Sequence, residues 1–263
     1  MKEYFPLKKY KTPENARRSI FAKIAAIRTL IFYYAILKIV LKAGRAASKG
    51  LYDDEQWAMR SYDAIVAAEN CGCDVEIIGL ENISDTEGPA VFIGNHMSVF
   101  ETFALACTIM PNKRPAFIIK KELVEYPFFG KVMKAIKHIA VSRKNPKDDF
   151  KEVMEQGCSL ISQGYSPVVF PQATRMREFV PEKFNSIGVK LARKAAVPVI
   201  PIALKTDFWG NGRFIKDFGP IGRLSNKIFI EFAPAIKVEG SGKDEHERIV
   251  SFIKGRLAEW EKL

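Results

Sequence analysis

One histidine stands where an acid–base catalyst could be placed. His96 directly follows residues 89–95, an apolar run that predicts a buried strand, and Glu101 comes five residues later. A carboxylate beside an imidazole can fix its tautomer and stabilise the imidazolium that forms on proton uptake. Positions five apart face different sides of an ideal helix, so we expect His96 before a helix and Glu101 in its first turns. Taken alone, one His near one Glu favours a purely structural polar pair.

Basic and polar side chains occupy the ends of three further apolar runs. Guanidinium forks and lysine ammonium groups are common partners of phosphate, and a lysine could instead stabilise an oxyanion. Outside any motif, each of these basic residues is more simply read as a solvated surface charge. The candidates are Lys120, Lys121, Arg143, Gln172, Thr174 and Arg175.

These residues need a sheet whose strand ends meet. Short apolar strands that alternate with helical stretches predict an α/β fold, with a mixed, largely parallel sheet covered by helices on both faces. Chemistry in such sheets gathers in loops at strand ends. The predicted strands are 74–80, 89–95, 115–120, 138–142, 167–171, 197–204 and 227–235, and the predicted helices lie near 100–110, 146–164, 184–196 and 244–262.

The formal net charge of +11 is concentrated at the N-terminus. Residues 1–50 hold twelve Lys and Arg against Glu3 and Glu14, and they surround the apolar run 29–41. Nucleic-acid binding would instead place basic residues beside aromatic or motif residues in the folded domain. We therefore expect a domain at 51–263 with a core near 75–235, and a segment at 1–50 that attracts anionic lipid rather than nucleic acid.

The apolar run 29–41 is thirteen residues long and contains Lys38, whereas a membrane span needs about 20 apolar residues. We expect a helix that lies in the membrane interface, peripheral or monotopic, at the cytoplasmic face of the cell membrane. The alternative is that this helix only packs on the domain. Export through the Arg17-Arg18 pair is disfavoured, because charged residues interrupt the apolar run.

Metal and cysteine chemistry have little support. Cys71 and Cys73 form one close pair with no second pair at zinc-ligand spacing, and the chain has three histidines. We expect reduced thiols and no metal. His138 begins a predicted strand and His246 lies among acidic residues at a helix start, so neither is a catalytic candidate.

Four segments, in order, resemble the motifs of the 1-acylglycerol-3-phosphate acyltransferase family. The first, NHMSVFE, resembles His-x4-Asp with Glu in place of Asp. The third, FPQATR, resembles Phe-Pro-Glu-Gly-Thr-Arg. The segments are 95–101 (NHMSVFE), 117–123 (FIIKKEL) with Gly130 and 140–143 (AVSR), 170–175 (FPQATR) and 197–202 (VPVIPI).

This resemblance implies acyl transfer from a coenzyme A or acyl carrier protein thioester to the hydroxyl of a lysophospholipid such as 1-acylglycerol-3-phosphate, giving phosphatidic acid. It implies His96 as general base oriented by Glu101, no cofactor, and no covalent acyl-enzyme. The residue types are consistent with direct attack by the acceptor alcohol, because the chain has no Gly-x-Ser-x-Gly elbow and no cysteine paired with a base. The basic and polar candidates would then bind the acceptor phosphate.

Three replacements within these motifs leave the acceptor open. Glu101 is one methylene longer than Asp, Gln172 removes a negative charge beside Arg175, and Ala173 adds a Cβ where the family has Gly. The alternatives are an acyltransferase for another lipid acceptor, such as an amino-acid lipid or a lipid A precursor, and a catalytically silent lipid-binding protein. The apolar residues at 117–119 and 126–129 are either core or the wall of an acyl channel.

Overall fold

The computed structural model describes the chain except for residues 1, 7, 128, 173, 214–216 and 223–226. Its strands are β1 (Tyr10–Lys11), β2 (Asp74–Ile78), β3 (Val91–Gly94), β4 (Arg114–Lys120), β5 (His138–Val141), β6 (Tyr165–Val169), β7 (Val199–Lys205) and β8 (Lys227–Phe232). They form one eight-stranded sheet in the order β1-β2-β8-β7-β3-β6-β4-β5.

The sheet is mixed and largely parallel, as the sequence predicts. Strands β7, β3, β6, β4 and β5 are parallel neighbours. Strand β8 pairs antiparallel with β7, β2 runs parallel to β8, and β1 closes the edge antiparallel to β2. The carboxyl ends of the five parallel strands therefore meet at one edge, which is where the candidate residues of the sequence fall.

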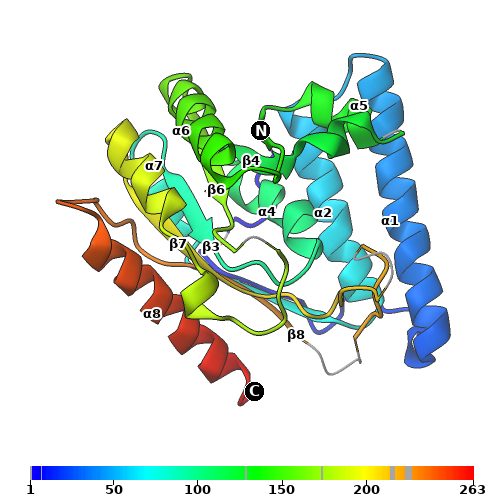
Figure 1. Cartoon of the computed structure of the whole chain (residues 1–263). Helices are drawn as coiled ribbons and strands as arrows, with labels where there is room; N and C mark the ends of the chain where they lie inside the picture. The colour runs from blue at the N-terminus through cyan, green and yellow to red at the C-terminus, as the bar shows by residue number, and fades with distance from the viewer. Residues whose placement is uncertain (1, 7, 128, 173, 214–216, 223–226) are drawn as a thin grey trace.

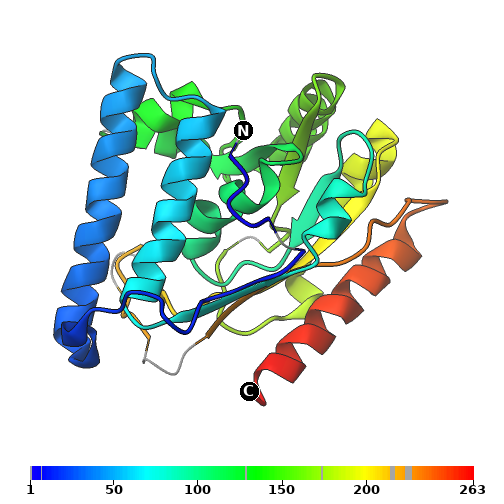
Figure 2. The same cartoon turned by 180° about the vertical axis from the view of Figure 1, so that it is seen from behind.

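Helices cover both faces of the sheet. Figures 1 and 2 show α1, α2 and α4 on one side and α6, α7 and α8 on the other. The helices are α1 (Ala25–Ser48), α2 (Asp54–Asn70), α3 (Glu81–Ser84), α4 (Phe100–Ile109), α5 (Phe129–Ala135), α6 (Pro146–Ser162), α7 (Ile187–Ala195) and α8 (Lys243–Trp260), with 3-10 turns η1 (Ile20–Lys23), η2 (Lys121–Glu125) and η3 (Pro181–Lys183).

Alternation along the central strands divides the interior into two cores. On β3, Phe92 joins the core under α1, α2 and α4, whereas Val91 and Ile93 join the core under α6, α7 and α8. All four β3 residues are buried because helices lie over both faces. This central strand ends two residues before His96, so the histidine starts from a rigid position.

Helices α2 and α5 and strand β1 are not among the predicted elements. Helix α2 begins after Asp53, whose side chain accepts a hydrogen bond from the Gln56 N–H at 2.8 Å, and it buries Trp57, Ala58 and Ser61. Asp53 is a good N-cap, and small buried residues recur along the helix at helical spacing. That signal is present in the sequence but weak, because alanine and serine carry little hydrophobic contrast.

Helix α1 both packs on the domain and leaves an apolar face uncovered. It contacts α2 and α5 and buries Phe32, Ile36 and Ile39, so one side of the helix packs on the domain. Leu30, on the opposite side, is 70% exposed. Apolar residues therefore occur all round the helix, some packed on the domain and some exposed. None of the helices in the described part of the chain is long and apolar enough to cross a membrane.

Candidate active site

The backbone of His96 is held by two neighbouring strands. Asn95, which directly follows β3, donates to the Leu204 carbonyl at 2.7 Å and accepts from the Leu204 N–H at 2.9 Å. The His96 N–H donates to Gln172 Oε1 at 2.9 Å, and the Met176 N–H donates to the His96 carbonyl at 2.9 Å. Strand β7 and the loop after β6 thus fix the backbone from which the imidazole projects.

Glu101 and His96 form the predicted pair. Glu101 lies in the first turn of α4 and is completely buried, and its Oε2 contacts His96 Nδ1. Its Oε1 accepts the N–H groups of Met97 at 2.8 Å and Ser98 at 3.0 Å. A carboxylate only accepts hydrogen bonds, so this contact suits the tautomer with the proton on Nδ1 and with Nε2 as the acceptor. The longer Glu side chain therefore does reach the ring.

Two further residues complete the pair's surroundings: Thr206, which sequence reasoning missed, and Phe170, which begins the third motif but had no predicted role. Thr206, directly after β7, donates its hydroxyl to Glu101 Oε1. The Phe170 ring stacks on the His96 imidazole, with centroids 4.4 Å apart and planes at 8°. Both contacts span more than seventy residues, so only the order of the strands brings them together. Their places in the chain could have indicated them, because Thr206 and Phe170 directly follow strands β7 and β6.

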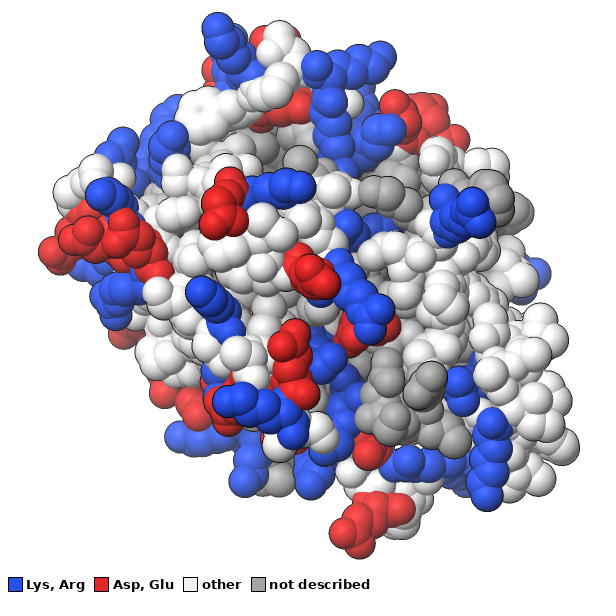
Figure 3. All heavy atoms as spheres, turned by 60° about the horizontal axis from the view of Figure 1, so that its bottom comes forward, with Lys and Arg blue, Asp and Glu red and all other residues white. Residues whose placement is uncertain are grey.

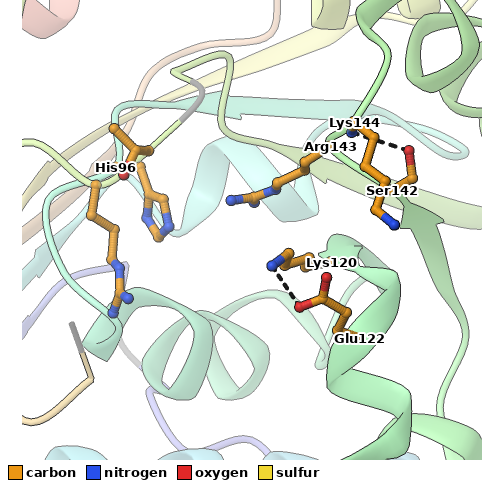
Figure 4. Close-up of a pocket in the computed structure, with 8 residues that line it drawn as sticks. His96, Lys120, Glu122, Ser142, Arg143 and Lys144 are labelled. Carbon is orange, nitrogen blue, oxygen red and sulfur yellow. Dashed lines mark hydrogen bonds and ion pairs between the residues drawn. The ribbon is translucent and has the colours of Figure 1, made fainter. Parts of the chain in front are cut away.

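A cationic cavity of about 490 Å³ opens beside His96 (Figure 4). His96, Lys120 and Arg143 point into a common space from the ends of three strands, and Lys120 pairs with Glu122 at 2.6 Å. Thr174 and Arg175 also line this cavity. Lys121 does not: its side chain is exposed on η2, because the chain turns away after β4.

Arg143 and Arg175 lie close enough to influence each other. The pKa of Arg143 is lowered, first by burial and then by the positive charge of Arg175. The Arg143 backbone is in the left-handed region at φ 57°, which is uncommon for a non-glycine residue and is often found at functional sites. Two guanidinium groups in one partly buried cavity favour an anionic ligand that offsets their repulsion.

An apolar channel of about 570 Å³ continues from the same site toward α1, α2 and α5. Its wall includes Phe117, Ile118, Ile119, Tyr126 and Phe129, and two of these, Phe117 and Ile119, also belong to the buried core. Phe128, predicted to join them, lies outside the described residues, and so does Ala173 of the third motif. Sequence reasoning missed the wall contributed by α1, which consists of Ile39, Val40 and Ala43.

Gln172 is buried and lines the channel together with His96. Its Oε1 accepts from the His96 N–H, a contact that a carboxylate could also make. Its Nε2 is buried and has no hydrogen-bond partner among the described residues. Replacement of the family's Glu by Gln thus keeps the acceptor and adds a donor that a ligand oxygen could satisfy.

The described residues show no metal-ligand cluster, and three of the cysteines are deeply buried. No group of three or more His, Cys, Asp or Glu side chains among them could hold a metal ion. Burial raises the pKa of Cys71 to about 11 and that of Cys107 to about 12, and it also raises the pKa of Cys73. These thiols are protonated at neutral pH and are therefore poor nucleophiles.

Sheet, histidine–carboxylate pair and adjoining cavities together describe an α/β enzyme. A family model described as "Acyltransferase" matches residues 74–205. The chain is 32% identical over 190 residues to the 1-acyl-sn-glycerol-3-phosphate acyltransferase of Pseudomonas aeruginosa. The aligned residues cover 72% of this chain and 68% of that one. The chain therefore belongs to the acyltransferase family.

A plant relative matches over a smaller part of its length, and a solved structure matches over nearly all of it. The chloroplastic 1-acyl-sn-glycerol-3-phosphate acyltransferase LPAT1 of Arabidopsis thaliana is 30% identical over 133 residues, 49% of this chain and 35% of that one. A crystal structure of the 1-acyl-sn-glycerophosphate (LPA) acyltransferase PlsC from Thermotoga maritima superposes with a TM-score of 0.70 at 18% identity, over 90% of this chain and 96% of that chain. The second match establishes a shared fold.

Proposed function

We propose that this protein transfers an acyl chain from a thioester donor to the free hydroxyl of 1-acylglycerol-3-phosphate, giving phosphatidic acid. The observation that carries the proposal is the pair of His96 with the buried Glu101, in which His96 lines both a cationic cavity and an apolar channel. A lysophospholipid acceptor needs both environments, one for its phosphate and one for its chain. The name of the Pseudomonas aeruginosa relative supports the same reaction.

His96 would act as the general base. With Nδ1–H held by Glu101, Nε2 removes the proton of the acceptor hydroxyl as its oxygen attacks the thioester carbonyl. The tetrahedral intermediate then collapses, the C–S bond breaks, and the imidazolium returns its proton to the departing thiolate. A positioned base of this kind typically contributes about 10²–10⁴-fold to the rate. The products are an oxygen ester and a free thiol.

The cations of the cavity would bind the acceptor phosphate. Arg143 and Arg175 offer planar donor forks, and Lys120 offers a mobile charge for the phosphate or for the oxyanion. Thr174 adds a hydroxyl to the same wall. Gln172 Nε2, buried and without a partner among the described residues, is suited to an oxygen of the acceptor glycerol. Lys121 has no place in this arrangement.

The donor would be an acyl-coenzyme A or an acyl carrier protein thioester, used as a co-substrate without any cofactor or metal. No covalent acyl-enzyme is required, because the acceptor oxygen itself attacks the donor. The raised pKa values of the buried thiols agree with this assignment. The apolar channel would hold an acyl chain during transfer.

The uncovered face of α1 would lie in the membrane interface at the cytoplasmic side, as a peripheral or monotopic contact. Leu30, Tyr34 and Leu37 follow helical spacing and are 70%, 63% and 53% exposed. Lys38, Lys42 and Arg45 on the same helix could reach anionic headgroups. The right-hand edge of Figure 3, over α1, is mostly uncharged with basic side chains spaced along it.

The test is turnover by the purified protein with a labelled acyl donor and a panel of lysolipids. We expect phosphatidic acid from 1-acylglycerol-3-phosphate, and loss of turnover by at least about 10²-fold in His96→Ala with unchanged vesicle binding. His246→Ala is the matched control, since this histidine lies on α8 away from the cavity. Equal turnover in His96→Ala and the unmodified protein would contradict the mechanism.

A second candidate acceptor is another lysolipid with a different head group. Gln172 favours it, because an amide replaces the carboxylate that the family carries beside Arg175. The same panel separates the two candidates. A kcat/KM that is higher for a lysolipid without a phosphomonoester than for 1-acylglycerol-3-phosphate would identify that lysolipid as the acceptor.

A further inference from the structure

The loop between β7 and β8 connects helix α1 to the active site. Its described part contains Trp209, whose indole N–H donates to the Asp217 carbonyl at 3.1 Å and to the Tyr33 hydroxyl of α1 at 3.1 Å. The Tyr33 hydroxyl in turn donates to the Gly219 carbonyl at 2.6 Å. On the other side, the Asn211 side-chain amide donates to the Met97 carbonyl, beside His96, at 2.9 Å. These contacts hold the Asp217 backbone in a defined position.

Asp217 uses this position to bind a cation of the cavity. Its Oδ1 lies 2.6 Å from Arg175 Nη2, and the Arg175 side chain is only 14% exposed. The other terminal nitrogen of Arg175, Nη1, is buried and has no partner among the described residues. A buried guanidinium donor without a partner is costly unless a ligand satisfies it. Arg175 lines both cavities, so such a ligand would be an anion bound beside His96.

We infer that Asp217 is a positioning residue for the acceptor phosphate. This inference rests on the proposed function. Asp217 fixes one arm of the Arg175 fork and so directs the other arm toward the phosphate. A long, flexible side chain that is held in its binding conformation loses less entropy when the ligand binds. Neither the composition of the loop nor any of the four motifs indicates this role.

The Asp217 carboxylate would also repel a phosphate, and the two effects must be compared. The Asp217 side chain is 48% exposed, so water screens its longer-range repulsion. The contact with Arg175 is short, and the arginine is mostly buried, so this attraction is screened less. Burial and the charge of Arg175 lower the pKa of Arg143, and the carboxylate of Asp149 opposes this shift, so Arg175 keeps Asp217 as its own counter-ion. Positioning therefore outweighs repulsion.

The test is steady-state kinetics of Asp217→Asn with both substrates varied. We expect the KM for 1-acylglycerol-3-phosphate to rise roughly three- to tenfold, with a much smaller change in kcat and in the KM of the donor. Asp217→Glu should restore most of the acceptor affinity. In an Arg175→Lys background the further effect of Asp217→Asn should be lost, because a lysine has no second arm to direct.

Asp74→Asn is the matched control, because Asp74 is also a half-exposed carboxylate paired with an arginine, Arg18, but lies on β2 away from the cavity. An unchanged or lower acceptor KM in Asp217→Asn would overturn the inference. So would a parallel change in kcat and both KM values, which indicates only a structural role.

Calorimetric binding of glycerol 3-phosphate separates this inference from the proposed function. If the protein shows no His96-dependent turnover with any lysolipid, the proposed function fails. Weaker binding of glycerol 3-phosphate to Asp217→Asn than to the unmodified protein would still support the positioning role. If Asp217→Asn does not fold, the comparison uses Asp217→Glu, for which a more than tenfold loss of binding would overturn the inference.

Discussion

At the scale of single residues, hydrogen bonds satisfy both oxygens of the Glu101 carboxylate. It receives hydrogen bonds from two backbone N–H groups, the Thr206 hydroxyl and the His96 ring, while completely buried. A buried carboxylate is tolerated only when its oxygens are satisfied in this way. The same bonds fix its orientation, so the imidazole has one preferred tautomer.

Glu101→Gln should reduce kcat by roughly 10²–10⁴-fold, because an amide nitrogen facing Nδ1 favours the wrong tautomer and removes the charge that stabilises the imidazolium. The acceptor KM should change little, since Glu101 is not among the residues that line either cavity. Stopped assays with labelled donor measure both. Glu69→Gln is the control, because Glu69 is buried and hydrogen-bonded to Tyr10 and Thr12 at the far edge of the sheet. A comparable loss of kcat in both variants would mean a general effect on folding.

Part of this site could be predicted from sequence. His96, Glu101, Arg143 and Arg175 belong to short motifs at strand ends, and the structure brings them together. Their catalytic and binding roles remain predictions. Asp217 could not be predicted, because it follows no strand directly and its partner is 42 residues away in the chain.

At the scale of elements, helix α1 has two different faces. One contributes to the channel through Ile39, Val40 and Ala43, and the other exposes apolar side chains. Removing residues 1–45 is therefore a poor test of membrane association, because it would also open the channel. Substitutions confined to one face separate the two roles.

Ala43→Phe should shorten the acyl chains that the protein accepts. Ala43 is 5% exposed and lines the channel, so a phenyl ring there occupies space that an acyl chain needs. We expect kcat/KM to fall for long acyl donors or acceptors and to be retained for short ones. Leu37→Phe, on the exposed face of the same helix, is the control. An unchanged chain-length profile in Ala43→Phe would show that the channel does not hold the chain.

The double substitution Leu30→Asp and Leu37→Asp should weaken binding to anionic vesicles by at least about tenfold, since two apolar side chains are lost from the interface and two negative charges are added. Co-sedimentation with vesicles that contain phosphatidylglycerol measures this. Phe150→Asp is the control, because Phe150 is an exposed apolar residue on α6, on the opposite face of the sheet. Equal binding of all three proteins would refute the assignment of the α1 face.

At the scale of the whole molecule, stability should depend on His246. This residue lies on α8 and stacks on Phe184, with ring centroids 5.9 Å apart. Burial lowers its pKa below the ordinary value of 6.5. The folded protein therefore binds this proton less readily than the unfolded chain, and stability is lost as the pH falls below about 6.5.

His246→Gln should remove this part of the pH dependence. We expect the difference in free energy of unfolding between pH 7.5 and pH 5.5 to be smaller in the variant than in the unmodified protein, as measured by urea denaturation. Carboxylates that titrate in both proteins contribute equally to the two differences, so they cancel in the comparison. An identical difference in the variant and the unmodified protein would contradict the assignment.

The sequence by itself determined the features that depend on local periodicity and residue type. Alternating apolar strands and helices defined the α/β class, and the motifs placed His96 and the arginines at strand ends. Tertiary structure alone decided which residues surround them. Thr206, Phe170 and Asp217 reach the site because β7, β3 and β6 are neighbours in the sheet. The α1 wall reaches it because that helix packs on α2 and α5. Such contacts depend on strand order and helix packing, which no local pattern encodes.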